Sequence, residues 1–307
     1  MQEENATPYK KIVTKMDARG KLLRFWHMDG GVSAQVTAIE METWDNQNVK
    51  LIVRRHGIAD RQRDPHIARH EFQLLSMLRE QGIAVAEPYF VDDSGEVFAD
   101  PYIVMSFAQG ETNVNPQQTR DYVEKLAMGL ARIHGVECTR EEVSFLGNQQ
   151  SAIANKLETP PVALDETLDE GIIRNVLNSV WPLSRTNRDC LLHGDFWPGN
   201  ILWKNGELIA IIDWEDAAWG DPLSDVGNAR LEVLWAFGHD AMAAFTVAYT
   251  RFMPNIDMNH LPYWDLCAAL RPASQLSHWG LGKETETRMR KRHSWFVRQA
   301  IESSSLL

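Results

Sequence analysis

The stretch LLHGDFWPGNILWKNGELIAIIDWEDA, residues 191–217, contains two apolar runs on either side of a Lys204-Asn205-Gly206 turn. Asn-Gly supplies the positive φ angles that a tight turn needs, so the pattern predicts a two-stranded hairpin. Five polar residues stand at the two outer ends of this hairpin: His193, Asp195, Asn200, Asp213 and Glu215. So many polar groups beside a small apolar hairpin indicate a functional site.

Oxygen ligands dominate this polar group. Asp195 and Asn200 lie five residues apart and Asp213 follows the second run, so the hairpin is expected to bring them to one edge. Mg²⁺ prefers oxygen ligands and is often completed by waters and phosphates, whereas structural zinc needs Cys or several His ligands. A carboxylate near such a metal can orient a hydroxyl and accept its proton during phosphoryl transfer. Each residue alone has a purely structural explanation, but together they predict phosphoryl-transfer chemistry.

Composition limits the class of protein. The chain has 307 residues and is 44% hydrophobic, which allows a large core in one domain or in two unequal lobes. Its formal charge of −11 argues against general nucleic-acid binding. The sequence has no apolar run of about 18 residues and no apolar leader, so we expect a cytoplasmic protein that does not bind membranes. Three widely spaced cysteines fit neither a disulfide framework nor a zinc site.

The pattern of apolar residues divides the chain into two parts. After a short polar helical opening, the first part is expected to contain a helix over 65–82 and strands at 21–28, 33–44, 49–55, 86–91 and 101–106. The second part is expected to be mainly helical, with helices over 116–136, 168–186, 222–252, 260–279 and 284–303. We therefore predict an α+β fold: a five-stranded antiparallel sheet with one helix in residues 1–106, and a larger helical lobe in residues 107–307.

Two motifs carry a family resemblance. HGDFWPGN (193–200) and IDWEDAAWGDP (212–222) closely resemble the signature of the aminoglycoside phosphotransferase and choline kinase-like family, which has the bilobal protein-kinase-like fold. The resemblance implies that Asp195 is the catalytic aspartate and that Asn200 and Asp213 hold magnesium. It also implies that His193 and Asp225 support the catalytic loop. It leaves Glu215 without a role.

The resemblance extends to an arginine in the first lobe. In LIVRRHG (51–57) it implies that Arg54 contacts the nucleotide phosphates and that Glu71, on the following helix, is its partner. A guanidinium suits this role because it binds phosphate through paired donors. Arg55 is adjacent, so a shift of one residue in the strand would exchange the two arginines.

The nucleotide's other contacts are also implied by resemblance. IVMSFAQG (103–110) resembles the family's linker, in which backbone groups of Ser106 and Ala108 would pair with the adenine edge. The phosphate-covering turn would use Gly30, Gly31 and Ser33, although DGGVSA lacks the full glycine pattern of protein kinases. Whether the nucleotide is ATP or GTP stays open.

Two functions fit these features. The first is an ATP- and Mg²⁺-dependent kinase that phosphorylates a hydroxyl of a small molecule, such as an aminoglycoside or an amino alcohol. The alternative is a nucleotide-binding, non-catalytic regulator of the same fold. The stretch 137–170 holds eight acids and two bases, which favours a cationic acceptor. Trp197 and Trp219, close to the motifs, are the tryptophans predicted to line the acceptor pocket. The oligomeric state is not predicted.

Overall fold

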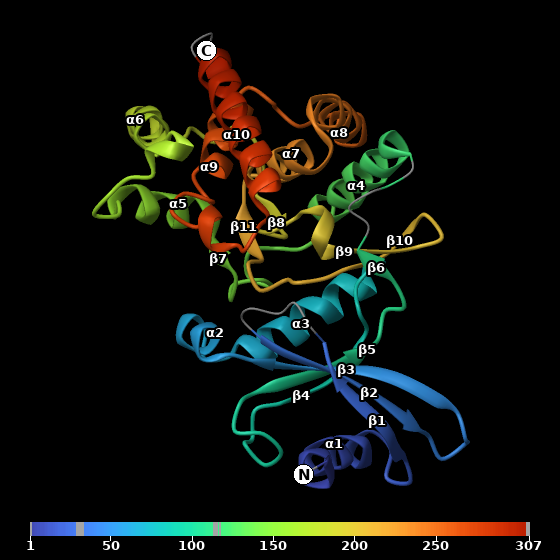
Figure 1. The fold of residues 1–307 in the computed structure, drawn as a ribbon. Coiled ribbons are helices and arrows are strands. Elements are labelled where there is room, and N and C mark those ends of the chain that lie inside the picture. Colours follow the sequence, from blue (N-terminus) through green and yellow to red (C-terminus); the bar gives the residue numbers. More distant parts are fainter. Residues whose placement is uncertain (1, 29–33, 113–115, 117, 305–307) are drawn as a thin grey trace. The chain divides into compact units, whose positions relative to one another are not determined.

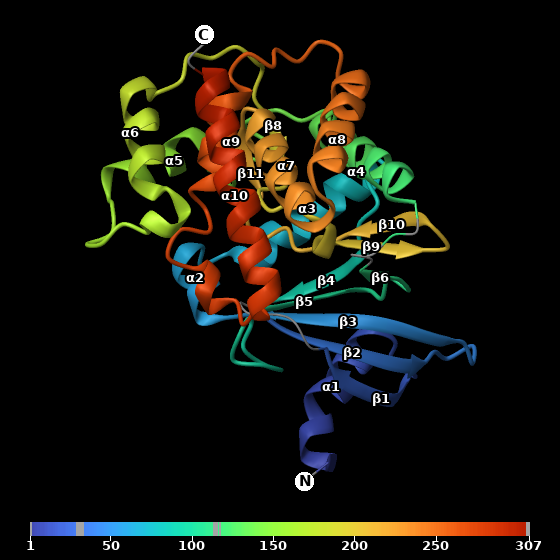
Figure 2. The same cartoon turned by 45° about the horizontal axis from the view of Figure 1, so that its top comes forward.

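The computed structural model describes the chain except residues 1, 29–33, 113–115, 117 and 305–307. The described chain forms two compact units, whose elements are labelled in Figure 1 and seen from a second direction in Figure 2. One unit is Met1–Gly110 with Ile209–Glu215, and the other is Glu111–Leu208 with Asp216–Leu307. The fold is mixed α+β, as predicted. Asp213 therefore belongs to the same unit as the N-terminal residues.

The first unit is built on a five-stranded antiparallel sheet. The strand order is β1-β2-β3-β5-β4, and every neighbouring pair is antiparallel. The strands are β1 (Lys21–His27), β2 (Ala34–Glu42), β3 (Asn48–His56), β4 (Pro88–Asp92) and β5 (Tyr102–Ser106). All five predicted strands are present, because each combines apolar alternation with clear turn residues at its ends.

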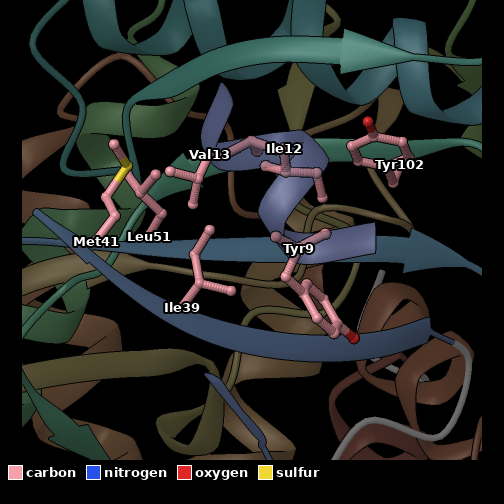
Figure 3. Close-up of a cluster of buried hydrophobic side chains, with 9 residues drawn as sticks. Tyr9, Ile12, Val13, Ile39, Met41, Leu51 and Tyr102 are labelled. Carbon is pink, nitrogen blue, oxygen red and sulfur yellow. The ribbon is translucent and has the colours of Figure 1, made fainter. Parts of the chain in front are cut away.

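Helix α1 (Gln2–Met16) covers one face of this sheet. Figure 3 shows Tyr9, Ile12 and Val13 of the helix pointing toward side chains of the strands. The buried strand residues of this cluster are Ile39, Met41, Leu51, Val53, Tyr102 and Val104. The Tyr9 hydroxyl is 3.1 Å from Oγ1 of Thr37, so the one polar atom of the tyrosine side chain is also satisfied.

Helix α3 (Ile67–Glu80) packs on the opposite face of the sheet. Successive side chains of a strand point to opposite faces, so Leu51 and Val53 face α1 while Arg54 reaches Glu71 of α3. A short helix, α2 (Ile58–Arg63), precedes α3 and was not predicted. Its six residues are too few to show an apolar period.

The second unit is mainly helical. Its helices are α4 (Thr119–His134), α5 (Gln149–Glu158), α6 (Glu170–Val180), α7 (Leu223–Phe237), α8 (His239–Phe252), α9 (Leu261–Ala269) and α10 (Lys283–Ser304). Short 3₁₀ turns lie at η1 (Glu166–Leu168), η2 (Pro198–Asn200) and η3 (Leu276–His278). Among the described residues, no helix is long and apolar enough to cross a membrane.

Short strands lie next to the two motifs. The strands β7 (Gly147–Asn148), β11 (Ala218–Gly220) and β8 (Cys190–Leu192) form one small sheet, and β10 (Glu207–Ile211), β9 (Ile201–Lys204) and β6 (Glu111–Thr112) form another. The predicted hairpin is β9–β10. Its turn residues Asn205 and Gly206 have φ of 53° and 78°, as an Asn-Gly turn requires.

Three predicted helices are shorter than expected, and the one predicted over 168–186 is Glu170–Val180. The helix predicted over 222–252 is broken at Gly238, whose φ of 93° is outside the helical range. The helix predicted over 260–279 ends at Ala269, because the residue before a proline disfavours helical backbone and Pro272 follows closely. Helix α5 was not predicted at all.

The packing of α1 gives a stability test. Ile12 is 0% exposed, so Ile12→Ala should lower the free energy of unfolding by about 2–5 kcal/mol through lost burial and a residual cavity. Urea unfolding monitored by tryptophan fluorescence would measure the change. The control is Val162→Ala, at a fully exposed position, which should change stability by less than about 0.5 kcal/mol. Equal stability of Ile12→Ala and the native chain would contradict the docking of α1.

Candidate active site

The motif 193–200 forms a loop between β8 and β9 whose backbone requires a glycine. Gly194 has φ of +82°, a conformation that favours glycine. A Cβ built on Gly194 would lie 1.9 Å from the carbonyl oxygen of Asp216. The loop therefore passes directly against the second motif at Asp216, and a side chain at position 194 has no room.

Asp225, in the first turn of α7, accepts hydrogen bonds from the backbone of this loop. It is 1% exposed and accepts the backbone N–H groups of His193 at 2.7 Å and Gly194 at 3.0 Å. The Nε2 atom of His134 is 3.3 Å from the same carboxylate, and Nδ1 of His134 is 2.7 Å from the Tyr249 hydroxyl. Burial opposes ionisation of Asp225, but these hydrogen bonds outweigh burial and lower its pKa. Asp225 thus stays charged while buried.

Asp195 is partly exposed and fixed by its neighbours in the loop. Its N–H donates to Nδ1 of His193 at 3.2 Å. The amide nitrogen of Asn200, in η2, lies 2.9 Å from the Asp195 carbonyl and 3.2 Å from its Oδ2. With that nitrogen engaged, no hydrogen bond from the described residues reaches Oδ1 of Asn200. An available amide oxygen is a suitable ligand for a hard cation.

The first unit contains a second polar cluster, centred on Arg54 of β3. Its Nη2 lies 3.1 Å from Oδ1 of Asp213 and 2.8 Å from Oε2 of Glu215, and its Nε lies 3.4 Å from Oε2 of Glu71. Glu71 is also 3.1 Å from Nε2 of His56. Burial disfavours the charge on Arg54, but the three carboxylates raise its pKa above the usual value. Arg54 therefore neutralises a concentration of negative charge around Asp213.

Arg55 lies in different surroundings. It pairs with Asp100 at 2.9 Å, and its guanidinium lies 4.3 Å from the centroid of the Phe98 ring. The alternation of side chains along β3 sends Arg54 and Arg55 to opposite faces. Of the two arginines that the sequence left open, Arg54 is the one beside Asp213 and Glu71.

The backbone at Asp213 has an unusual conformation. Its φ is 67°, which is rare outside glycine and is common at functional sites. The buried indole of Trp214 donates to the Ile211 carbonyl at 3.1 Å, and Arg63 donates to the Glu215 carbonyl at 2.9 Å. These contacts on both sides hold Asp213 in its left-handed conformation.

Asn200 and Asp213, the predicted metal ligands, each carry an oxygen atom suited to a hard cation. The described residues contain no group of three or more His, Cys, Asp and Glu side chains that could hold a metal ion. Asn200 and Asp213, which belong to different units, offer one amide oxygen and one carboxylate. Mg²⁺ commonly takes only one or two protein carboxylates or amides and completes its shell with phosphates and waters. Each residue by itself offers a ligand of the kind that this mode of binding uses.

The predicted nucleotide contacts are only partly described. The Ser106 N–H donates to the Glu87 carbonyl at 2.8 Å, and the Ala108 carbonyl accepts from Gly110 at 3.0 Å. In the described part of the chain, the Ala108 N–H has no backbone acceptor, so it is available to a ligand. Gly30, Gly31 and Ser33 lie outside the described residues.

Asp195 opens onto a cavity of about 180 Å³ within the second unit. Its wall includes Glu232 and Trp235 of α7, Arg271 just after α9, and Trp279. Nη2 of Arg271 lies 3.0 Å from Oδ1 of Asp195. Neither Glu232 nor Arg271 was predicted as a site residue. Arg271 precedes Pro272, and that proline was the available signal that position 271 lies outside a helix.

The two tryptophans predicted to line the acceptor pocket do not line the cavity beside Asp195. Trp219, on β11, lines a separate cavity of about 850 Å³ together with Cys138 and Cys190. The ring of Trp197 packs against Gly199 of its own loop, where it occupies the space of an added Cβ. Trp235 and Trp279 lie at the cavity of Asp195 instead.

Comparison with known proteins identifies the family. The model of the phosphotransferase enzyme family matches residues 29–254, which is most of the chain. The chain belongs to the phosphotransferase enzyme family. A curated relative, acyl-CoA dehydrogenase family member 11 of Rattus norvegicus, is 28% identical over 193 residues, which are 55% of this chain and 24% of the relative. The chain thus spans about a quarter of that protein's length.

Solved structures of this phosphotransferase family share the fold. An amicoumacin kinase, in complex with AMP-PNP, Ca²⁺ and Ami, aligns with a TM-score of 0.66 at 15% identity, covering 97% of this chain and 96% of its own. An aminoglycoside phosphotransferase, in ternary complex with AMP-PNP and hygromycin B, aligns with a TM-score of 0.64 at 17% identity, covering 95% and 98%. The kinase-like fold predicted from the sequence is confirmed.

The glycine in the loop gives a paired test. Gly194→Ala would force a Cβ into the Asp216 carbonyl, so it should lower the free energy of unfolding of the second unit by more than about 2 kcal/mol. The matched control is Gly206→Ala, where φ is +78° and an added Cβ meets nothing within 4 Å. Its cost should be only the backbone term, about 1 kcal/mol. Similar melting temperatures for the two variants would contradict the close approach at Gly194.

Glu232 gives a test by pH. Burial raises its pKa to about 8, the charge of Asp195 adds to the shift, and Arg271 opposes it. Between the ordinary pKa of Glu and about pH 8 the folded chain holds a proton that the unfolded chain has lost, so stability falls as pH rises through this window. Glu232→Gln mimics the protonated form and removes that loss. The variant should melt like the native chain at pH 5 and at a higher temperature at pH 9.

The control for this measurement is Glu80→Gln, at an exposed position on α3. It should shift the melting temperature equally at both pH values. A difference between Glu232→Gln and the native chain that does not change with pH would show that Glu232 is ionised throughout.

Proposed function

We propose that this chain is an ATP- and Mg²⁺-dependent kinase that transfers the γ-phosphate to a hydroxyl of a small molecule. The observation that carries the proposal is the carboxylate of Asp195: it is partly exposed, lies on a loop held by the buried Asp225, and borders a cavity. In this role Asp195 orients the acceptor hydroxyl and accepts its proton as the oxygen attacks phosphorus. His193 and Asp225 support the loop.

Arg54 is proposed to contact the phosphates of the nucleotide. Its ion pair with Glu71 supports this role, because a guanidinium held from behind keeps its terminal nitrogens oriented. Ala108 would pair with the adenine edge through its N–H and Ser106 through its carbonyl. The turn containing Gly30, Gly31 and Ser33 would cover the phosphates. Glu215, which shares Arg54 with Asp213, is proposed to keep Arg54 in place.

Asn200 and Asp213 are the proposed magnesium ligands. Bound Mg²⁺ would neutralise part of the charge on the transferring phosphates. The complexes of amicoumacin kinase with AMP-PNP and Ca²⁺, and of the aminoglycoside phosphotransferase with AMP-PNP, support a nucleotide triphosphate as the donor. A cytoplasmic location, where ATP is available, fits this chemistry.

The acceptor is proposed to enter the cavity beside Asp195. Its volume, about 180 Å³, is below the ~300–1,000 Å³ of typical ligand pockets, so the second unit encloses only part of an acceptor, such as one ring or a short chain. The indoles of Trp235 and Trp279 offer apolar faces to that part. Aminoglycosides, amino alcohols and neutral polyols are the classes to compare.

A non-catalytic nucleotide-binding regulator is the alternative, and Asp195 distinguishes the two. Under the kinase proposal, Asp195→Asn should lower kcat by about 10²–10⁴-fold, since the acceptor proton loses its base, with ATP affinity changed less than about twofold. Turnover is read as ADP release with a panel of hydroxyl acceptors, and affinity as the thermal shift with ATP and Mg²⁺. Asp240→Asn, at an exposed position on α8, is the control and should retain full activity.

Each outcome decides between the proposals. ATP stabilisation without turnover on any acceptor would favour the regulator. Full turnover of Asp195→Asn would remove Asp195 from the mechanism. If ATP did not stabilise the chain against heat, with or without magnesium, both the kinase and the regulator proposals would be overturned.

A further inference from the structure

Arg271 occupies a special place in the chain. Helix α9 ends at Ala269, and Pro272 prevents a further helical turn, so Arg271 stands in the short non-helical link after the helix. Its side chain is about one third exposed and lines the cavity that also contains Asp195 and Glu232. The position therefore combines a fixed backbone with a side chain at the reaction site.

The guanidinium of Arg271 donates hydrogen bonds to two adjacent residues of the catalytic loop. Its Nη1 donates to the carbonyl of Gly194, and its Nη2 donates to Oδ1 of Asp195 at 3.0 Å. The other carboxylate oxygen, Oδ2, is 3.2 Å from the amide nitrogen of Asn200. The two oxygens of Asp195 are thus held by different elements, and rotation of the carboxylate would break at least one hydrogen bond.

The pair between Arg271 and Asp195 is a poor stabiliser of the fold. Both side chains are about one third exposed, at 35% and 34%, and ion pairs of this kind contribute only about 0–1 kcal/mol. Buried pairs elsewhere in the unit, such as Arg230 with Asp265, are the stronger candidates for structural roles. The location of Arg271 is better explained by the carboxylate that it orients.

We propose that Arg271 is a positioning residue for Asp195. It sets the orientation in which the carboxylate of Asp195 receives the acceptor hydroxyl, and it does so by fixing the peptide before Asp195 and one oxygen of its side chain. This inference rests on the proposed kinase function. It adds a residue that lies 76 positions after Asp195 in the chain and outside both motifs.

The charge balance of the cavity supports this role. The pKa of Glu232, at about 8, keeps that carboxyl mainly protonated at neutral pH. The Arg271 guanidinium lies 3.0 Å from the carboxylate of Asp195 and 4.0 Å from that of Asp216. A neutral Glu232 does not compete for the guanidinium.

The test compares Arg271→Met and Arg271→Lys with the native chain on an acceptor identified by the screen. Misplacement of a reacting group by about 1 Å can cost 10²-fold in rate, so Arg271→Met should lower kcat by about 10²-fold. KM for ATP should change less than about twofold, because Arg271 does not belong to the proposed nucleotide site. Arg271→Lys should recover about tenfold of the loss, since an ammonium can meet Asp195 but cannot bridge two acceptors as a guanidinium does.

Guanidinium at tens of millimolar should raise the rate of Arg271→Met and leave the native rate unchanged. The matched control is Arg251→Met, which breaks an exposed pair with Glu124 on α8 and α4 and should keep the native kcat. Melting temperatures of all variants are recorded, and Arg271→Met should melt close to the native chain.

The outcomes separate this inference from the proposed function. A native chain that transfers no phosphate counts against the function itself. A native chain that does so, with Arg271→Met at the native kcat, overturns the positioning role alone. So does a loss of kcat that follows the melting temperature and is restored neither by lysine nor by guanidinium, because it shows that Arg271 is structural.

Discussion

A buried carboxylate that accepts two successive backbone N–H groups holds the loop that carries Asp195. Asp225 can do so only because Gly194 adopts φ of +82°, which turns neighbouring amides toward the same acceptor. Hydrogen bonds to a charged group contribute about 1.5–3 kcal/mol each, and an unpaired buried carboxylate costs more. The loop, Asp225 and His134 are therefore interdependent. Asp195 has a defined position because the residues before it cannot move independently.

In the first unit, one arginine balances the charge of several carboxylates. Glu71, Asp213 and Glu215 surround Arg54, so three negative charges share one cation. Without that cation the three carboxylates would repel one another. Under the proposed function, nucleotide phosphates and Arg54 attract each other, and Mg²⁺ would take over part of the neutralisation of Asp213. The cluster is then arranged to exchange partners when nucleotide binds.

Local signals account for what the sequence could predict. The strands, the Asn205-Gly206 turn and the spacing of Asp195 and Asn200 depend on residues close together in the chain, and each was found. Arg271, just after α9, and Glu232, on α7, were missed because both lie outside the two motifs in segments predicted to be helical, where a charged residue is read as part of a solvated face. Two of the helical errors had readable causes in Gly238 and Pro272. Helix α5 was not predicted because its ten residues carry only a weak apolar period.

Several acids of the stretch 137–170, which favoured a cationic acceptor in the sequence, have local partners in the structure. Glu142 accepts from the backbone N–H of Thr139, Asp165 accepts from Thr167 and Ser274, and Glu170 forms a buried pair with Arg174. These three acids serve turns and helix ends. At the cavity itself, Arg271 offsets Asp195 and Glu232 is mainly protonated at neutral pH. Under the proposed function, the charges at this cavity would not favour a cationic acceptor, and selectivity would depend on the shape and hydrogen bonding of the group that reaches Asp195.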